Sequence, residues 1–302
     1  MLNQEMLLKR LALVKLLYKG GLELSQQAGP SACFSILSFH DSIEMFLKLV
    51  CQHRNIKSDK FDFIEYWNSI PDLTLKESCN ALNERRKNIK HRGLLLDRSE
   101  IDSSRVTTKE FFEQNTFKQF GVQFNEVSLL TLVTYPTVRG FLEEASNYLK
   151  DEKNQESVGS AAIAFDELLT VYEESKHEGY NSPFFFGKSL EFNSSFFMGV
   201  KDREMAGFID NVKKSIEEMS RAIKIVSMGL DYKRFIKFDI LTPHVTKFIG
   251  GSRHLSEGWR IKKLTQANCQ FCIDFVVDCA IKLQDFDFSI GELFEPQEPH
   301  AH

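Results

Sequence analysis

Long apolar runs are missing from this sequence of 302 residues, and proline and glycine are scarce in it. No uninterrupted apolar stretch approaches the roughly 20 residues that a membrane-spanning helix needs. Charged residues are spaced through the first 21 positions, which is not the layout of a signal peptide. With 42% hydrophobic residues, 7 prolines and 16 glycines, the composition is that of a folded globular protein with a large core. We therefore expect a cytoplasmic protein with no membrane partner.

An overall positive charge is also missing. The formal net charge is −4 and the isoelectric point is about 6.1. A chain with this balance has no global electrostatic attraction to nucleic acid. Any binding of nucleic acid must come from a local basic patch.

The common catalytic and metal-binding motifs do not occur. There is no HExxH, no cluster of paired aspartates, no phosphate-binding loop and no GxSxG. Cys269 and Cys272 form a CxxC, but no second pair or nearby histidine completes a zinc site. Together with Cys279 they recur at helical spacing, which indicates buried core thiols. We expect no metal and no cofactor.

The apolar residues that are present follow helical periods, so the fold class is predicted to be mainly α. The charged stretch 151–157 is the best linker candidate, which predicts a helical bundle over 1–150 and a second, mostly helical domain over 151–302. The polar run 97–108 is typical of a loop. Helices are predicted at 2–19, 31–52, 61–70, 75–91, 109–120, 125–150 with a kink at Pro136, and 264–285.

One short stretch, LNERRKNIKHRG at 82–93, concentrates positive charge at the end of a predicted helix. Arg92-Gly93 fits a helix end, because a cation is favourable near the carbonyl terminus and glycine can turn the chain. Arg85, Asn88 and His91 follow one another at intervals of three, so they lie on one face of the helix. A guanidinium, an amide and an imidazole therefore project from a single helix end.

This stretch resembles the signature of the HEPN domain, a helical bundle whose mark is an arginine followed four to six residues later by a histidine. Four residues separate Arg86 from His91, and five separate Arg85 from it. The tail IKHRG and the upstream helix FHDSIEMFLK (39–48), with an acidic residue and a late lysine, are also similar to family members. In active members Asn, Asp or His often follows the arginine, whereas Arg86 is followed by lysine, which leaves the choice of arginine open. The resemblance covers about residues 1–150.

The resemblance implies a metal-independent endoribonuclease that acts as a homodimer with the motif at the interface, of the bacterial toxin or antiviral defence type. RNA would be the substrate, and an antitoxin or regulatory protein a further partner. An arginine stabilises charge that develops on a phosphoryl group, and a histidine can move a proton at the 2′-hydroxyl or the leaving oxygen. The catalytic candidates are Arg85, Arg86 and His91, and the substrate-binding or supporting candidates are Asn88, Lys87, Lys90, Arg92 and Glu44.

Other interpretations of the same residues remain open. The basic stretch is also what a solvated helix C-terminus looks like, and it would suit a non-catalytic HEPN module that binds nucleotide or RNA, or an interaction protein with an acidic partner. Asp41 and Glu44 lie in an apolar helix, where a buried ion-pair role is expected, and Glu44 would pair with Arg85 or Arg86. His40 is expected to be a core histidine. The Phe-rich segment 184–197 is expected to be core or a base-stacking surface.

Overall fold

The computed structural model describes residues 3–176, 184, 195, 198–247, 253–256 and 264–285. Within these residues the protein is mainly helical, as predicted, with ten α-helices and one two-stranded sheet. None of the described helices is both long and apolar enough to cross a bilayer. The chain divides into two compact units, Met1–Leu132 and Val133–His302.

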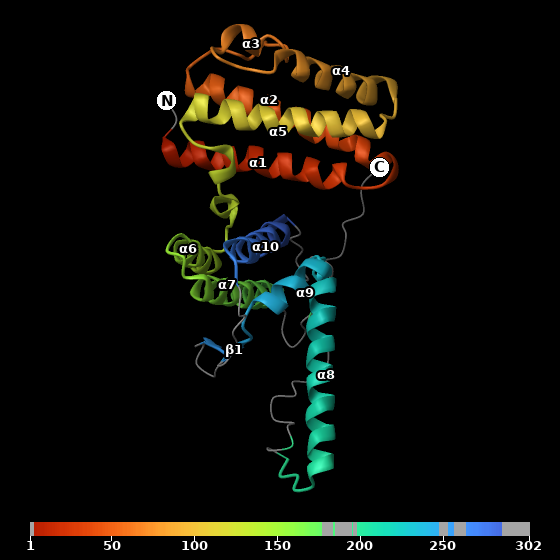
Figure 1. Ribbon diagram of the computed structural model, residues 1–302, viewed down its shortest axis with the longest axis vertical. Coiled ribbons are helices and arrows are strands. Elements are labelled where there is room, and N and C mark those ends of the chain that lie inside the picture. Colours follow the sequence, from red (N-terminus) through yellow and green to blue (C-terminus); the bar gives the residue numbers. More distant parts are fainter. Residues whose placement is uncertain are drawn as a thin grey trace, which may run out of the picture. The chain divides into compact units, whose positions relative to one another are not determined.

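The first unit is a bundle of four long helices in which successive helices run in opposite directions (Figure 1). Helix α2 lies between the others and contacts α1, α4 and α5. The long helices are α1 (Gln4–Ser25), α2 (Ser35–His53), α4 (Lys76–Arg92) and α5 (Arg98–Phe120). The short elements are η1 (Gly29–Phe34), α3 (Tyr66–Ser69), η2 (Phe124–Glu126) and η3 (Leu129–Leu132).

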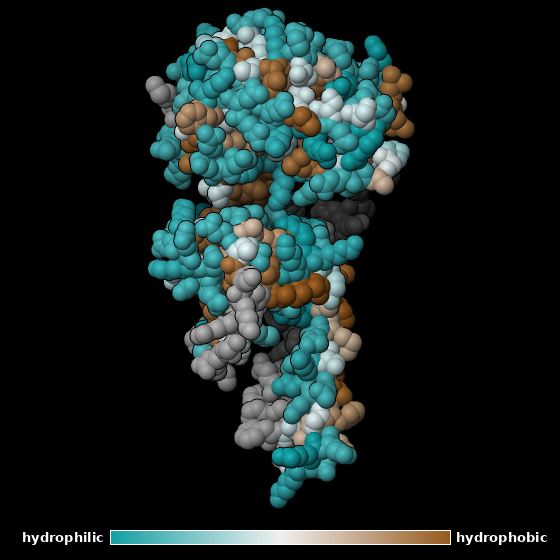
Figure 2. All heavy atoms as spheres, viewed as in Figure 1, coloured by the Kyte–Doolittle hydropathy of each residue, from teal (hydrophilic) through white to brown (hydrophobic). Residues whose placement is uncertain are grey.

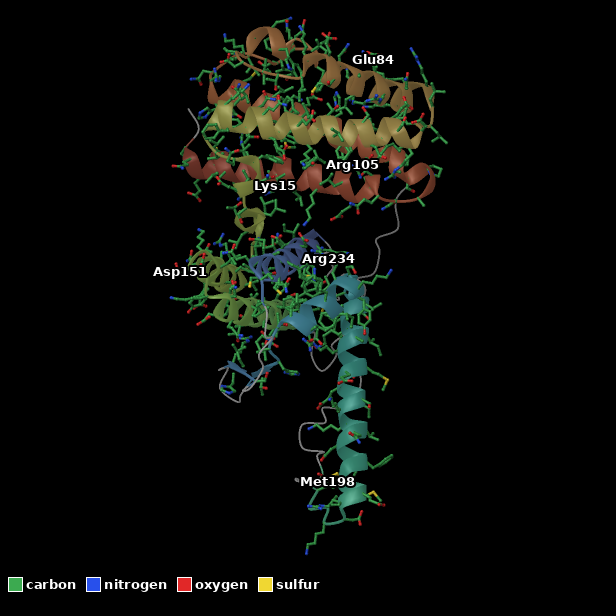
Figure 3. All side chains as sticks on the ribbon, viewed as in Figure 1. Lys15, Glu84, Arg105, Asp151, Met198 and Arg234 are labelled. Atoms are coloured by element: carbon green, nitrogen blue, oxygen red, sulfur yellow. The ribbon has the colours of Figure 1, made fainter. Side chains whose placement is uncertain are left out.

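Aromatic side chains form the centre of this bundle. Phe46 of α2 meets the rings of Phe111 and Phe112 of α5 edge to face, with centroids 5.4 and 5.7 Å apart. Phe112 in turn stacks on Phe124 at 4.3 Å. The segment after α5 is held to α1 by Lys15, whose Nζ donates to the carbonyl oxygens of Asn125 and Val127 at 2.9 and 2.6 Å (Figure 3). The first unit therefore includes the chain beyond α5.

Helix α4 ends where the sequence predicts. Gly93 adopts a left-handed φ of 64°, and its N–H and that of Leu94 donate to the carbonyl oxygens of Ile89 and Asn88. A glycine in this conformation closes the helix without the steric cost that a Cβ would bring. The last turn carries Lys90, His91 and Arg92.

The expected loop over 97–108 is wrong, because α5 begins at Arg98. Asp97 is its N-cap: Asp97 Oδ1 accepts from the Glu100 N–H at 2.8 Å, and Glu100 Oε2 accepts from the Asp97 N–H at 3.1 Å. This reciprocal pair is a capping box. The polar residues that resemble a loop therefore start a helix.

Helix α1 extends beyond the predicted end at residue 19, through Gly20 and Gly21. The helix continues to Ser25, and a Cβ added at Gly21 would lie 2.7 Å from the ring of Phe39. Glycine here allows α1 and α2 to approach closely. The predicted helix over 61–70 is reduced to α3.

In the second unit, α6 (Pro136–Lys150), α7 (Asn154–Ser175) and α10 (Gln266–Asp285) pack on one another. Helix α9 (Tyr232–Leu241) contacts α10 and α8 (Arg203–Ser227). The strands β1 (Val245–Lys247) and β2 (Arg253–Leu255) pair antiparallel with Val245 opposite Leu255. Phe184, which contacts Tyr172, is buried, and apart from it and Ser195 the Phe-rich segment 184–197 lies outside the described residues.

The compact units divide at 132/133 rather than at the expected 150/151. Helices α6 and α7 are separated only by a short turn, and Ser157 Oγ donates to the Ala145 carbonyl oxygen at 2.9 Å. The predicted linker 151–157 is thus a turn followed by the first residues of α7. The predicted helix over 125–150 is confirmed only from Pro136, where α6 begins and where proline suits a first turn.

The six cysteines are all free and buried, which confirms the prediction of core thiols. Burial raises the pKa of Cys79 and of Cys272 to about 12. Thiols in this state are poor nucleophiles and poor metal ligands at neutral pH.

Candidate functional site

The basic residues of the motif occupy the last two turns of α4, and they differ in exposure. The side chains of Arg85 and Arg86 are mostly buried, with 20% and 22% of their surface exposed. Lys87, Lys90 and His91 are exposed, as is Arg92. Only part of the cationic stretch is therefore available to a ligand.

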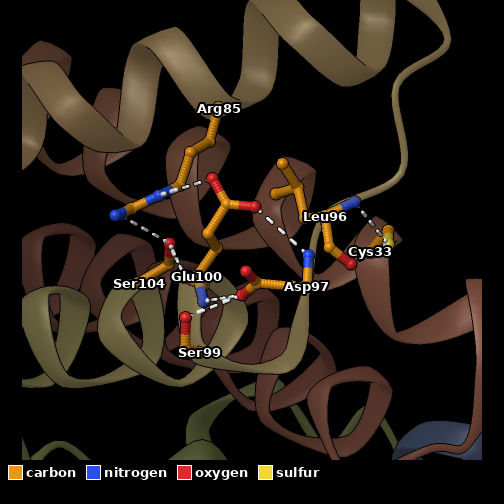
Figure 4. A network of polar contacts seen from close by, with 7 residues as sticks. All are labelled: Cys33, Arg85, Leu96, Asp97, Ser99, Glu100 and Ser104. Atoms are coloured by element: carbon orange, nitrogen blue, oxygen red, sulfur yellow. Dashed lines mark hydrogen bonds and ion pairs between the residues drawn. The ribbon is translucent and has the colours of Figure 1, made fainter.

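Arg85 faces α5 and belongs to a network of structural contacts (Figure 4). Its Nη1 donates to Ser104 Oγ at 3.1 Å, and its Nε lies 3.9 Å from Glu100 Oε1. Glu100 is also the partner of Asp97 in the capping box, and Ser104 Oγ donates to the Glu100 carbonyl oxygen. Arg85 thus joins the end of α4 to the beginning of α5.

Arg86 faces α2, where it lies beside the carboxylate of Asp41. The distance from Arg86 Nε to Asp41 Oδ1 is 3.9 Å, and the same oxygen is 3.2 Å from His40 Nδ1. The hydrogen bond from His40 is the main cause that lowers the pKa of Asp41, and the positive charges of Arg86 and Lys90 add to it. Asp41 is therefore a carboxylate at neutral pH and provides Arg86 with a counter-charge.

His40 is buried, as expected, but one of its ring nitrogens is unusual. The ring packs on Phe63 with centroids 4.2 Å apart, and its Nε2 is buried with no hydrogen-bond partner. Nδ1 makes the polar contacts, with Asp41 and, at 3.8 Å, with Glu44 Oε2. An imidazole held this way orients the Asp41 carboxylate from the core side.

The expected pairing of Glu44 with Arg85 or Arg86 is wrong. Glu44 Oε1 accepts from Lys48 Nζ at 2.6 Å, one turn along the same helix. The acidic residue that faces α4 is Asp41, three positions earlier. In the sequence, Asp41 and Glu44 are equally good candidates for pairing with a motif arginine. Only the rotation of α2 about its axis shows which of the two faces α4.

His91 is an exposed titratable group in the last turn of α4. Among the described residues, no hydrogen bond or ion pair holds His91 or Lys90. Asn88 Oδ1 accepts from Arg92 Nη1 at 3.1 Å, and Lys87 Nζ donates to Glu84 Oε1 at 2.8 Å. The imidazole is thus free to meet a ligand, whereas Asn88 and Lys87 already have partners on α4.

A cation could find ligand atoms near the motif, although the sequence predicts no metal. Donor atoms of His40, Asp41 and Glu44 lie within 4.8 Å of one another. Lys48 already pairs with the carboxylate of Glu44, and Arg86 lies beside that of Asp41. Cationic side chains therefore already balance the carboxylates of Asp41 and Glu44.

Comparisons with known proteins add no relative: no family model, no curated protein and no solved structure matches this chain.

Proposed function

We propose that this chain is a metal-independent endoribonuclease of the HEPN type that acts as a homodimer, with Arg86 and His91 as its reacting pair. The observation that carries the proposal is the geometry of the end of α4. An exposed His91, with no hydrogen bond or ion pair among the described residues, follows an arginine that lies beside a carboxylate from α2. The biological setting that suits such an enzyme is a bacterial toxin or an antiviral defence effector, with an antitoxin or regulatory partner.

The residue types fit cleavage of RNA by its own 2′-hydroxyl. A histidine takes the proton of the 2′-hydroxyl, the 2′-oxygen bonds to phosphorus, and the 5′-oxygen leaves with a proton from a second acid. The products are a 2′,3′-cyclic phosphate and a 5′-hydroxyl. Each chain offers one His91, so two copies whose motifs face one another supply both the base and the acid.

Arg86 suits the role of stabilising the phosphate. Its contact with Asp41 is through Nε and, at 3.9 Å, is longer than a hydrogen bond. The guanidinium is thus oriented yet keeps donors for phosphoryl oxygens, where negative charge builds in the transition state. Lys87, Lys90 and Arg92 add attraction to the RNA backbone without reading its sequence.

The test is the variant His91→Ala, assayed on single-stranded RNA in the presence of EDTA. Removing a general acid–base residue typically costs 10²–10⁴-fold in rate, so we expect cleavage to fall by at least about 100-fold. Because His91 is exposed at a helix end, the far-ultraviolet circular dichroism should not change. His244→Ala, which removes an exposed histidine of the second unit, is the matched control.

Unchanged cleavage by His91→Ala would rule out this site. The end group of the products gives a second check, because a 3′-phosphate formed without a cyclic intermediate contradicts attack by the 2′-hydroxyl.

A second candidate is a module that binds RNA or nucleotide without cleaving it. The engagement of Arg85 with Ser104 and Glu100 favours it, since this leaves Arg86 as the one candidate catalytic arginine per chain. In that case the wild-type protein would bind RNA with an affinity that falls steeply with salt, and no product would form.

A further inference from the structure

Helix α8 carries an apolar seam that repeats every seven residues. Along Arg203–Ser227, apolar residues alternate at intervals of four and three, which is the a and d pattern of a coiled coil. The a positions are Ile209, Ile216 and Ile223, and the d positions are Met205, Val212, Met219 and Val226. The seam covers three heptads without a charged residue.

Six of these seven side chains are exposed to solvent to an extent that is unusual for residues of their kind, and Ile209 is half-buried. Met205 and Met219 are 54% and 56% exposed, and Val226 is 59% exposed. Val212, Ile216 and Ile223 are also exposed, and Phe208 beside the seam is 65% exposed. Figure 2 shows apolar side chains along one edge of α8. A contiguous apolar surface of this kind marks an interaction site.

The ion pairs of α8 with α7 and α9 lie on the opposite face of the helix. Lys224 Nζ donates to Glu173 Oε2 of α7 at 2.7 Å, and Arg221 Nη1 lies 2.6 Å from Asp239 Oδ1 of α9. Ile225 is fully buried. These residues occupy the b, f and c positions, which point away from the seam. Among the residues that the structure describes, packing of the second unit therefore leaves six of the seven seam residues exposed.

The residues that flank the seam fit a copy of the same helix better than a charged partner. The e positions are Ala206, Lys213 and Ser220, and the g positions are Phe208, Ser215 and Ala222. The one charge among them, Lys213, lies 3.7 Å from Glu217 of the same helix. Two identical helices bring identical flanks together. Flanks with a single charge, which already lies near an acid of its own helix, avoid strong self-repulsion and lack the complementary charges by which a coiled coil selects a different partner.

We propose that α8 pairs with α8 of a second copy of this chain, forming a two-helix coiled coil through its a and d residues. The 25-residue helix is about 37 Å long, and three heptads alone form a weak coiled coil. Association through α8 is therefore weak and reversible, and the fraction of paired chains rises with protein concentration. The proposal does not rest on the ribonuclease assignment, because it concerns a different unit.

Cross-linking of single introduced cysteines tests the pairing in the full chain. Ile216 lies near the middle of α8, so parallel and antiparallel pairing both bring it close to its copy. We expect Ile216→Cys, treated with a short bismaleimide, to give a covalent dimer. Lys214→Cys, at an outer f position, is the control and should give at least tenfold less. The six native cysteines are buried, so the wild type should not react.

Adding Met219→Glu to Ile216→Cys should reduce the covalent dimer at least tenfold, because it places a charge in the seam. Met205→Cys then reports direction, since it links to its copy only in a parallel pair. Equal yields from Ile216→Cys and Lys214→Cys, or no dimer from Ile216→Cys, would overturn the proposal. Circular dichroism of each variant confirms that α8 remains helical.

Discussion

Adjacent residues on a helix point about 100° apart, and this rotation sends Arg85 and Arg86 to different neighbours. Arg85 reaches Ser104 and Glu100 on α5, whereas Arg86 reaches Asp41 on α2. Both spacings to His91 fit the HEPN pattern, so the sequence could not choose between them. The structure separates an arginine that joins two helices from one that lies beside a carboxylate near an exposed histidine.

This separation predicts different effects of two equivalent substitutions. Arg86→Lys should lower RNA cleavage at least tenfold with little change in thermal stability, because lysine cannot present a planar fork to a phosphate. Arg85→Lys should retain most of the cleavage and lower the unfolding temperature, since it breaks the link to Ser104. Initial rates and melting curves of the two variants are compared. The reverse pattern would make Arg85 the catalytic arginine.

Asp41 links stability to pH. Its pKa is lowered by the hydrogen bond from His40 and by Arg86 and Lys90, so its contribution is present above the ordinary carboxyl pKa and is lost as pH falls through the lowered value. The side chain is 53% exposed, so screening limits the effect. We expect Asp41→Asn to cost under about 1 kcal/mol of unfolding free energy at pH 7 and less at pH 3.

Urea unfolding at the two pH values measures this difference. Glu84→Gln, which removes an exposed acid that pairs with Lys87, is the control. A cost for Asp41→Asn that is equal at both pH values would mean that its charge is not the cause.

At the scale of elements, the periodicity of apolar residues predicted most helices, and capping residues predicted some of the helix ends. Arg92-Gly93 was interpreted correctly as the end of α4. The start of α5 was not predicted, because Asp97 and Glu100 stand in a run of polar residues that has the composition of a loop. The continuity of α1 was missed for a different reason: Gly21 is present to accommodate the ring of Phe39, and a single sequence does not show which helix will pass close by.

Two glycine substitutions should show the difference between a glycine that the backbone needs and one that it does not. Gly93 has a φ of 64°, where a side chain is disfavoured, so Gly93→Ala should destabilise the protein by about 1 kcal/mol. Gly140 lies within α6 with open space around an added Cβ, so Gly140→Ala should stabilise by about 0.5–1 kcal/mol. Chemical denaturation of both variants gives the two signs. A stabilising Gly93→Ala would contradict the left-handed helix end on which the orientation of His91 depends.

At the scale of the whole molecule, the compact units divide at a different place from the predicted boundary, because a tight turn between two antiparallel helices has the composition of a linker. The charged residues at 151–153 cover the turn between α6 and α7, whose apolar faces pack on one another. The actual division at 132/133 lies among apolar residues, Leu132 and Val133, and carries no polar signal. A polar composition indicates that a segment is exposed to solvent. An exposed segment can be a turn within a domain as well as a linker between two domains.

The two possible boundaries make opposite predictions for truncated chains. Residues 1–132 should form a helical domain that unfolds cooperatively, because its core and the contacts of Lys15 with Asn125 and Val127 are all retained. Residues 1–150 add α6, whose buried face of Val138, Leu142 and Ala145 would be left without α7. We expect this longer fragment to gain no unfolding free energy and to self-associate more at high concentration. Urea denaturation and light scattering of the two fragments measure both effects. If 1–150 were the more stable by over about 1 kcal/mol and remained monomeric, α6 would belong to the bundle that carries the motif.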